Sequence, residues 1–132
     1  MMDDRSDAER AAALWLTQMR AYETAIAALP NARSLDAELF FSAPRAVLAA
    51  AAAHLGVPLS AAMIDEQVDG PLFATYSKNP SVRFDNDDRL SRRAALLPML
   101  RDEIAEAERW VAGRSDNAFA TNAALTAAAL LG

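Results

Sequence analysis

Residues that break helices divide this chain into segments whose length and apolar spacing suit helices. The breakers are Pro30-Asn31, Gly56, Gly70-Pro71 and Gly113. Alanine, the best helix former, supplies about a quarter of the chain, and 53% of all residues are hydrophobic. The 132 residues suffice for one core of modest size. The sequence therefore predicts a mainly α fold in a single helical domain, residues 1–132, with about five helices in an irregular bundle and at most one short strand.

Capping residues and apolar periodicity predict the first two helices. Ser6 and Glu9 have the spacing of a capping box, which starts a helix that should end near Leu29. Ser42 is the expected N-cap of the second helix, over residues 44–55, because proline follows it closely in the first turn.

Similar signals predict the two helices that follow. Ser60 is the expected cap of a third helix, over about residues 61–68. The acidic cluster of residues 85–88 favours the positive end of a helix dipole, so a long fourth helix should begin there and end at Gly113. Pro98 should kink this helix or split it into two segments.

Three assignments complete the predicted secondary structure. Gly56 should end the second helix in the left-handed conformation. Ser115 or Asp116 can cap a last, alanine-rich helix. At most one short strand is expected, near residues 33–35.

Charge and composition exclude several classes of partner. The formal net charge of −5 gives no positive field for nucleic acid or an anionic membrane surface. The chain has no cysteine, so disulfides, thiolate metal sites and a cysteine nucleophile are excluded. The first residues lack the pattern of a secretory signal, and no apolar stretch is long enough to span a bilayer. We therefore expect a cytoplasmic protein that binds neither nucleic acid nor membranes.

The longest stretch without a helical pattern, residues 72–84, contains the only lysine of the chain, Lys78. Ser77 precedes this lysine and Arg83 follows it, so an ammonium, a hydroxyl and a guanidinium are close in sequence. Such a group can meet a phosphate or a carboxylate. The alternative is that a genome rich in G and C favours arginine and leaves one lysine by chance.

Other candidates for chemistry have simpler explanations. His54 is the sole histidine, so a multi-histidine metal site is excluded, and a structural role in its helix is favoured over a general base. The acidic residues 85–88 lack the glycine and the distal glutamate of a calcium loop, which favours a helix cap over a cation site. All four glycines are isolated, so phosphate-binding glycine loops are absent. The residues assign no catalytic group and no metal.

Short motifs in the first half of the chain occur in a characteristic order. They are Ser34-Leu35-Asp36-Ala37-Glu38, Ser42-Ala43-Pro44, Val47-Leu48 and His54-Leu55-Gly56-Val57. The loop Tyr76-Ser77-Lys78-Asn79-Pro80 and a long helix ending at Trp110 follow them. From about Ala8 to Trp110, this order resembles the C-terminal part of bacterial sulfotransferases.

The resemblance implies transfer of a sulfonate from 3′-phosphoadenosine-5′-phosphosulfate to a hydroxyl or amine of a small-molecule acceptor. It also implies that the helices belong to an α/β fold whose phosphosulfate-binding strand, loop and helix, and whose catalytic base, would lie before Met1. Lys78 and Arg83 match a late basic loop that touches the 3′-phosphate, and Ser77 is a matching hydroxyl donor. The arginine-lysine-glycine form of that loop is not present here.

The sequence leaves alternative functions open. The first is a partial sulfotransferase domain that is inactive alone and has either lost its catalytic half or needs it in trans, because transfer requires charge stabilisation and a base in fixed geometry. The second is a small non-enzymatic helical module that buries its alanine-rich faces against itself, as a homo-oligomer, or against a partner. A degenerate remnant is the third.

Overall fold

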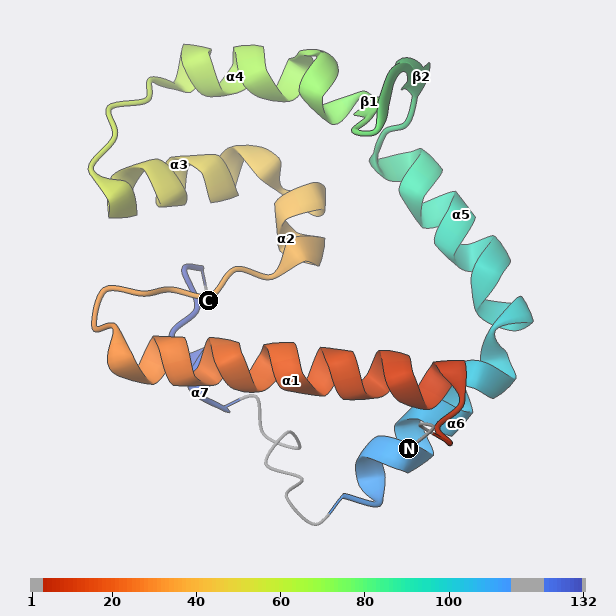
Figure 1. Ribbon diagram of the computed structural model, residues 1–132. Helices are drawn as coiled ribbons and strands as arrows, with labels where there is room; N and C mark the ends of the chain where they lie inside the picture. Colours follow the sequence, from red (N-terminus) through yellow and green to blue (C-terminus); the bar gives the residue numbers. More distant parts are fainter. Residues whose placement is uncertain (1–3, 115–122, 132) are drawn as a thin grey trace. The chain divides into compact units, whose positions relative to one another are not determined.

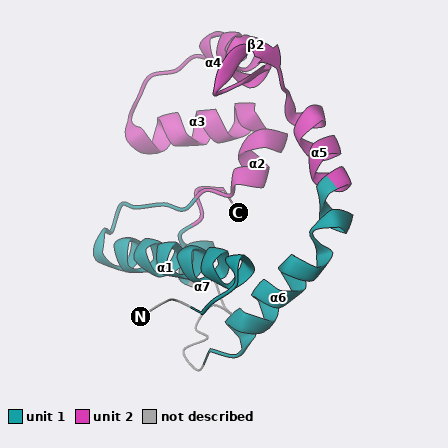
Figure 2. Ribbon diagram, turned by 45° about the vertical axis from the view of Figure 1, so that its right-hand side comes forward, with its two compact units in different colours: residues 1–34, 96–128 teal, residues 35–95, 129–132 magenta. Residues whose placement is uncertain are grey.

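The computed structural model describes residues 4–114 and 123–131. These residues are mainly helical and contain one small two-stranded sheet, which confirms the predicted mainly α class (Figure 1). The chain divides into two compact units, residues 1–34 with 96–128 and residues 35–95 with 129–132 (Figure 2). Each unit is described by itself below.

The first unit is built on the long helix α1 (Asp7–Ala28), which packs against α6 (Arg101–Ala112) and α7 (Ala123–Ala127). The predicted capping box is confirmed, because the Ser6 hydroxyl accepts a hydrogen bond from the Glu9 amide at 3.2 Å. The Glu9 carboxylate accepts one from the Ser6 amide at 3.1 Å in return. These bonds satisfy amides that the first helical turn leaves without partners.

The chain after α1 is extended at Ser34, but residues 33–35 do not form the predicted strand. The Ser34 amide donates to the Ala128 carbonyl at 2.9 Å, and the Ser34 hydroxyl donates to the Leu125 carbonyl. These acceptors lie in and directly after α7, so no strand runs beside Ser34 to extend the pairing. The predicted short strand is therefore reduced to a single bridge residue, Ser34, and the strands of the described chain are β1 and β2, within residues 75–83.

The second unit begins with three helices, α2 (Ala37–Ser42), α3 (Pro44–Leu55) and α4 (Ala61–Asp69). The bounds of α3 are those predicted, and the predicted left-handed end is confirmed, because Gly56 has φ of 66°. The predicted cap of α4 is also confirmed, since the Ser60 hydroxyl accepts from the Met63 amide at 3.2 Å.

The predicted N-cap of α3 was wrong. Ser42 belongs to α2, and its hydroxyl donates to the Leu39 carbonyl at 3.4 Å. Ala43 is the N-cap of α3 and makes no side-chain cap bond. The reason is α2 itself, which the sequence did not reveal, and which starts where the Asp36 carboxylate accepts from the Glu38 amide at 2.8 Å.

Helices α3 and α4 pack together around the core of this unit. Val47, Ala52 and Ile64 are its buried apolar side chains among the described residues. On the surface, the Arg45 guanidinium ties the two helices, because it lies 2.7 Å from the Asp65 carboxylate and 2.6 Å from that of Asp69.

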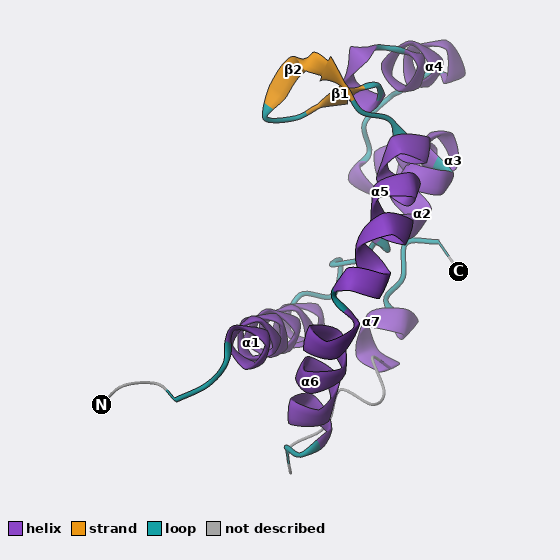
Figure 3. Cartoon of the chain, turned by 90° about the vertical axis from the view of Figure 1, so that its right-hand side faces the viewer, coloured by secondary structure: helices purple, strands orange, loops and turns teal. Residues whose placement is uncertain are grey.

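A short 3-10 helix, η1 (Pro71–Phe73), connects α4 to a hairpin of β1 (Thr75–Tyr76) and β2 (Asn79–Arg83) (Figure 3). The strands are antiparallel, with Tyr76 opposite Asn79 and Thr75 opposite Arg83. The sharp turn into η1 requires glycine, because a Cβ at Gly70 would lie 2.8 Å from the Glu66 carbonyl oxygen.

Helix α5 (Asn86–Met99) follows the hairpin and contains Pro98, and α6 begins two residues after α5 ends. The predicted split near Pro98 is confirmed. The predicted caps Ser115 and Asp116 lie outside the described residues. The described chain has seven α-helices in place of about five, because α2 forms and the long fourth helix is divided.

Candidate functional site

A cavity of about 670 Å³ lies in the second unit, where α2, η1, the hairpin and the first turn of α5 meet. We call it the aromatic pocket. Its aromatic lining residues are Phe40, Phe41, Phe73, Tyr76 and Phe84. Its volume falls within the range of about 300–1,000 Å³ that is typical of small-molecule sites.

The aromatic rings of the pocket contact one another in pairs. The ring centroid of Phe40 lies 5.6 Å from that of Phe41 and 5.6 Å from that of Phe73. Tyr76 and Phe84 meet edge to face at 5.8 Å. Such pairs fix ring orientation, so the pocket presents both faces and edges of π-systems to a ligand.

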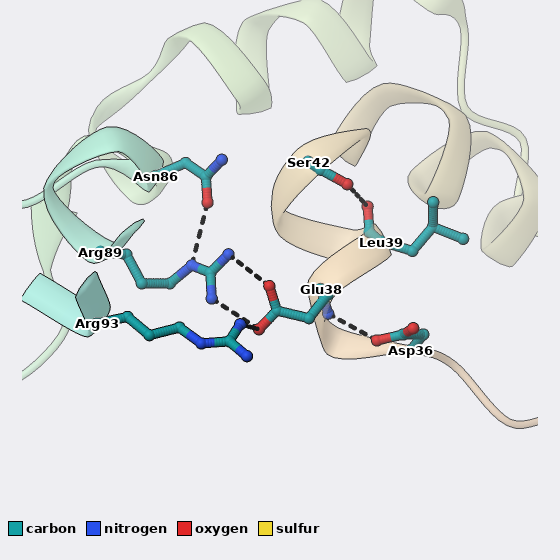
Figure 4. A network of polar contacts seen from close by, with 7 residues as sticks. All are labelled: Asp36, Glu38, Leu39, Ser42, Asn86, Arg89 and Arg93. Atoms are coloured by element: carbon teal, nitrogen blue, oxygen red, sulfur yellow. Dashed lines mark hydrogen bonds and ion pairs between the residues drawn. The ribbon is translucent and has the colours of Figure 1, made fainter. Parts of the chain in front are cut away.

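An arginine at the edge of the pocket is held by residues far apart in sequence (Figure 4). The Arg89 guanidinium donates to both carboxylate oxygens of Glu38, at 2.9 and 3.0 Å, and its Nε donates to Asn86 at 3.0 Å. Arg93 adds a second contact to Glu38 at 3.3 Å. Arg89 also lies over the ring of Phe41, with 4.9 Å from its central carbon to the ring centroid.

This network compensates the positive charge of Arg89. The hydrogen bond from Arg89 lowers the pKa of Glu38 below its ordinary value, and the same bond raises the pKa of Arg89. Glu38 is about half exposed, so solvent screens the pair. The network therefore fixes the position of Arg89 and engages all three nitrogens of its guanidinium.

The acidic residues at the start of α5 cap that helix, as predicted. The Asp85 carboxylate accepts from the Asp88 amide at 3.0 Å, and the Asp88 carboxylate accepts from the Asp85 amide at 3.1 Å. The hydrogen bond from the Asp88 amide is the largest cause that lowers the pKa of Asp85. The ion pair with Arg83, at 2.5 Å, lowers this pKa further. Asp87 also lines the pocket, and among the described residues its carboxylate has no ion pair within 4 Å.

The hairpin holds the three residues predicted to bind the cofactor. Ser77 lines the aromatic pocket, and Lys78 follows it in the exposed turn. No hydrogen bond or ion pair with another described residue engages the Lys78 ammonium. Arg83 lies at the other end of the hairpin, opposite Thr75, and is paired with Asp85. The structure thus places Ser77 and Lys78 together and separates Arg83 from them.

Comparisons with protein-family models, curated proteins and solved structures found no match for this chain. In the ranges 4–114 and 123–131, no group of three or more histidine, aspartate or glutamate residues could hold a metal ion. His54 is exposed in the last turn of α3 and does not line the aromatic pocket. Within the same ranges, no helix is long and apolar enough to cross a membrane.

Sequence reasoning missed the aromatic pocket and its arginine. Glu38 and Arg89 are 51 residues apart, and no local pattern joins them. The loop of residues 72–84, which was singled out, supplies part of the lining. The neighbouring pair Phe40 and Phe41 was a second available signal, because aromatic side chains contribute strongly to cores and interfaces.

Proposed function

We propose that this chain is a sulfotransferase-like helical region that contributes to a nucleotide-phosphate site and does not transfer sulfonate alone. The resemblance over residues 8–110 motivates the proposal, and one observation of the site supports it. Lys78 lies in an exposed turn directly after Ser77, which lines the aromatic pocket. A partner chain carrying the phosphosulfate loop would complete the site in the cytoplasm.

Lys78 and Ser77 suit the phosphate of such a nucleotide. The ammonium offers three donors and a full charge, and the serine hydroxyl adds another donor. Arg83 is the weaker candidate of the three, because its guanidinium is already paired with Asp85. A phosphate would have to compete with that carboxylate.

We further propose that the isolated chain does not transfer sulfonate, and the charge pairing at the site supports this part of the proposal. Sulfonate transfer needs donors fixed on the leaving phosphate and a base at the acceptor. Among the described residues, Arg83 and Arg89 are paired with carboxylates, and the sole histidine lies outside the pocket. Sulfonate transfer by the purified chain alone would contradict this part of the proposal.

Calorimetric titration with adenosine 3′,5′-bisphosphate tests the phosphate site directly. We expect saturable binding that weakens about fivefold in Lys78→Ala and is largely kept in Lys78→Arg, because the exposed charge supplies a modest share of the affinity. Adenosine without phosphates should bind equally to the wild type and Lys78→Ala. A folded wild type that does not bind, or equal affinity in Lys78→Ala, would overturn the proposal.

A second candidate, self-association, is favoured by one face of α1. Trp15 and Tyr22 lie seven residues apart on this helix and are 44% and 58% exposed, and the C-cap residue Leu29 is 57% exposed. A repeat of seven places apolar side chains along one seam, which suits another helix. The occupant proposed is α1 of a second copy of this chain.

Sedimentation of two matched variants tests this candidate. Tyr22→Arg puts a charge into the seam and should shift the protein to monomer. Thr24→Arg adds the same charge on another face of α1, where Thr24 is exposed, and should leave the assembly unchanged. A wild type that sediments as a monomer at all concentrations would exclude self-association.

A further inference from the structure

We infer that the aromatic pocket binds an organic amine, that is, a primary ammonium group on an aromatic or aliphatic body. This inference goes beyond the proposed function, which concerns the phosphate at the turn of the hairpin. It rests on the size of the pocket, on its rings and on the balance of charges along its wall.

The lining residues indicate which kind of apolar group the ligand carries. Five aromatic side chains surround the cavity of about 670 Å³, and Pro44, Val68 and Leu72 add apolar surface. A cavity of this volume holds a small organic molecule, and its rings favour an apolar or planar body.

The charge of the ligand follows from the ion pairs. Three ionised side chains line the pocket, and two of them have partners, because Asp85 pairs with Arg83 and Arg89 pairs with Glu38. Asp87 is the remaining one, and its carboxylate has no ion pair within 4 Å among the described residues, so it can meet a cationic group of a ligand. Helix α5 does not reverse this preference, since the Asp85 carboxylate already accepts from the amides of its first turn.

The aromatic rings also favour a positive charge on the ligand. The faces of aromatic rings attract cations through the negative charge of the ring face. The pocket already shows this interaction, because the Arg89 guanidinium lies 4.9 Å from the centroid of Phe41. An ammonium between the rings and Asp87 would gain both contacts, whereas a carboxylate would meet repulsion from Asp87.

Three probes of similar shape and different charge test the inference. Titrations followed by calorimetry would use 2-phenylethylamine, the neutral 2-phenylethanol and the anionic 3-phenylpropionate. We expect the amine to bind the wild type most tightly and the acid most weakly. Equal affinity for the alcohol and the amine, or no binding of any probe by the folded protein, would overturn the inference.

Asp87→Asn isolates the carboxylate. It should weaken the affinity for the amine about threefold to fivefold and leave the affinity for the alcohol unchanged, since exposed ion pairs contribute up to about 1 kcal/mol. Asp102→Asn is the matched control, because it removes the same charge from the first turn of α6, outside the pocket lining, and should change nothing. An unchanged affinity for the amine in Asp87→Asn would overturn the inference.

Lys78→Ala separates this inference from the proposed function. Lys78→Ala should weaken binding of the nucleotide and leave binding of the amine unchanged. Asp87→Asn should weaken binding of the amine and leave binding of the nucleotide unchanged. Phe73→Leu keeps an apolar side chain and removes a π face, so it should reduce amine binding more than alcohol binding. Circular dichroism of each variant confirms that the helices are retained.

Discussion

Glu38 shows how one residue can organise a surface of this protein. Its carboxylate accepts from Arg89 and also contacts Arg93, so it joins α2 to α5 within the second unit. Arg89 lines the aromatic pocket, and Arg93 follows it four residues later in α5. Removing Glu38 would therefore release Arg89 and alter the charge at the edge of the aromatic pocket.

The contribution of Glu38 to stability should depend on pH in a defined direction. Its folded pKa is lowered, so its contribution is present above the ordinary glutamate pKa and is lost as pH falls through the folded value. We expect Glu38→Gln to melt a few degrees lower than the wild type at neutral pH, with the difference vanishing in acid.

Thermal melts between neutral and acidic pH check this expectation. Glu103→Gln is a suitable control, because Glu103 is exposed in α6 and its effect should not depend on an ion pair. A difference between wild type and Glu38→Gln that grows on acidification would contradict the expected sign.

Glu38 also shows which side-chain roles could not be predicted from the sequence. Ser6 with Glu9 and Ser60 act on amides within three residues, so their roles were predictable. Glu38 acts on a partner 51 residues away. Ser77, Lys78 and Arg83 were chosen by chemical type, and whether they bind a nucleotide remains a prediction.

At the scale of elements, local conformational signals gave the most accurate predictions. Residues 44–55 form a helix with the predicted bounds, because proline at its start and Gly56 at its end act through backbone geometry alone. The hairpin depends instead on pairing between strands, and α2 is only six residues long. Weak or non-local signals of this kind explain the missed elements.

Gly56→Ala tests the left-handed end of α3. No atom lies within 4 Å of the added Cβ, so the cost is conformational alone, about 1–2 kcal/mol. Urea denaturation should show this loss, and Gly56→Asn should lose less because asparagine tolerates this conformation. Equal stability of Gly56→Ala and wild type would contradict the assigned conformation.

The start of α1 provides a separate test in the first unit. Ser6→Ala removes the acceptor of the Glu9 amide and should cost about 1 kcal/mol. Ser6→Thr retains a hydroxyl and should recover most of the loss. Denaturation curves of the three proteins, followed by circular dichroism, measure both effects.

At the scale of the whole molecule, the described cores are small. Two apolar side chains are buried in α1 of the first unit, Ala12 and Leu16, and three in the second. Meanwhile many large apolar side chains, including Leu14, Leu55 and Leu72, are more than half exposed. Cores of this size favour stabilisation by a bound partner.

Self-association would make stability depend on protein concentration. If α1 pairs with a second copy, the melting temperature should rise with concentration, because the folded state gains binding energy. Tyr22→Arg should remove this dependence, whereas Thr24→Arg should keep it. Calorimetric scans over a hundredfold range of concentration measure the effect, and a constant melting temperature of the wild type would refute it.

The mainly α fold class was predictable from the sequence, because helix-breaking residues and a high alanine content are found along the whole chain. The grouping of the chain was less accessible. The single helical domain stays a prediction, and the chain groups into two compact units, each assembled from segments distant in sequence. Such grouping depends on contacts between segments, for which one sequence carries no direct signal.

The position of Lys78 also gives experimental access to the hairpin. A protease specific for lysine finds one such peptide bond in this chain, between Lys78 and Asn79, in an exposed turn. Cleavage there would open the hairpin and yield two fragments, of residues 1–78 and 79–132. The rate of that single cut reports how well the turn is covered, so a bound nucleotide would appear as protection of one bond.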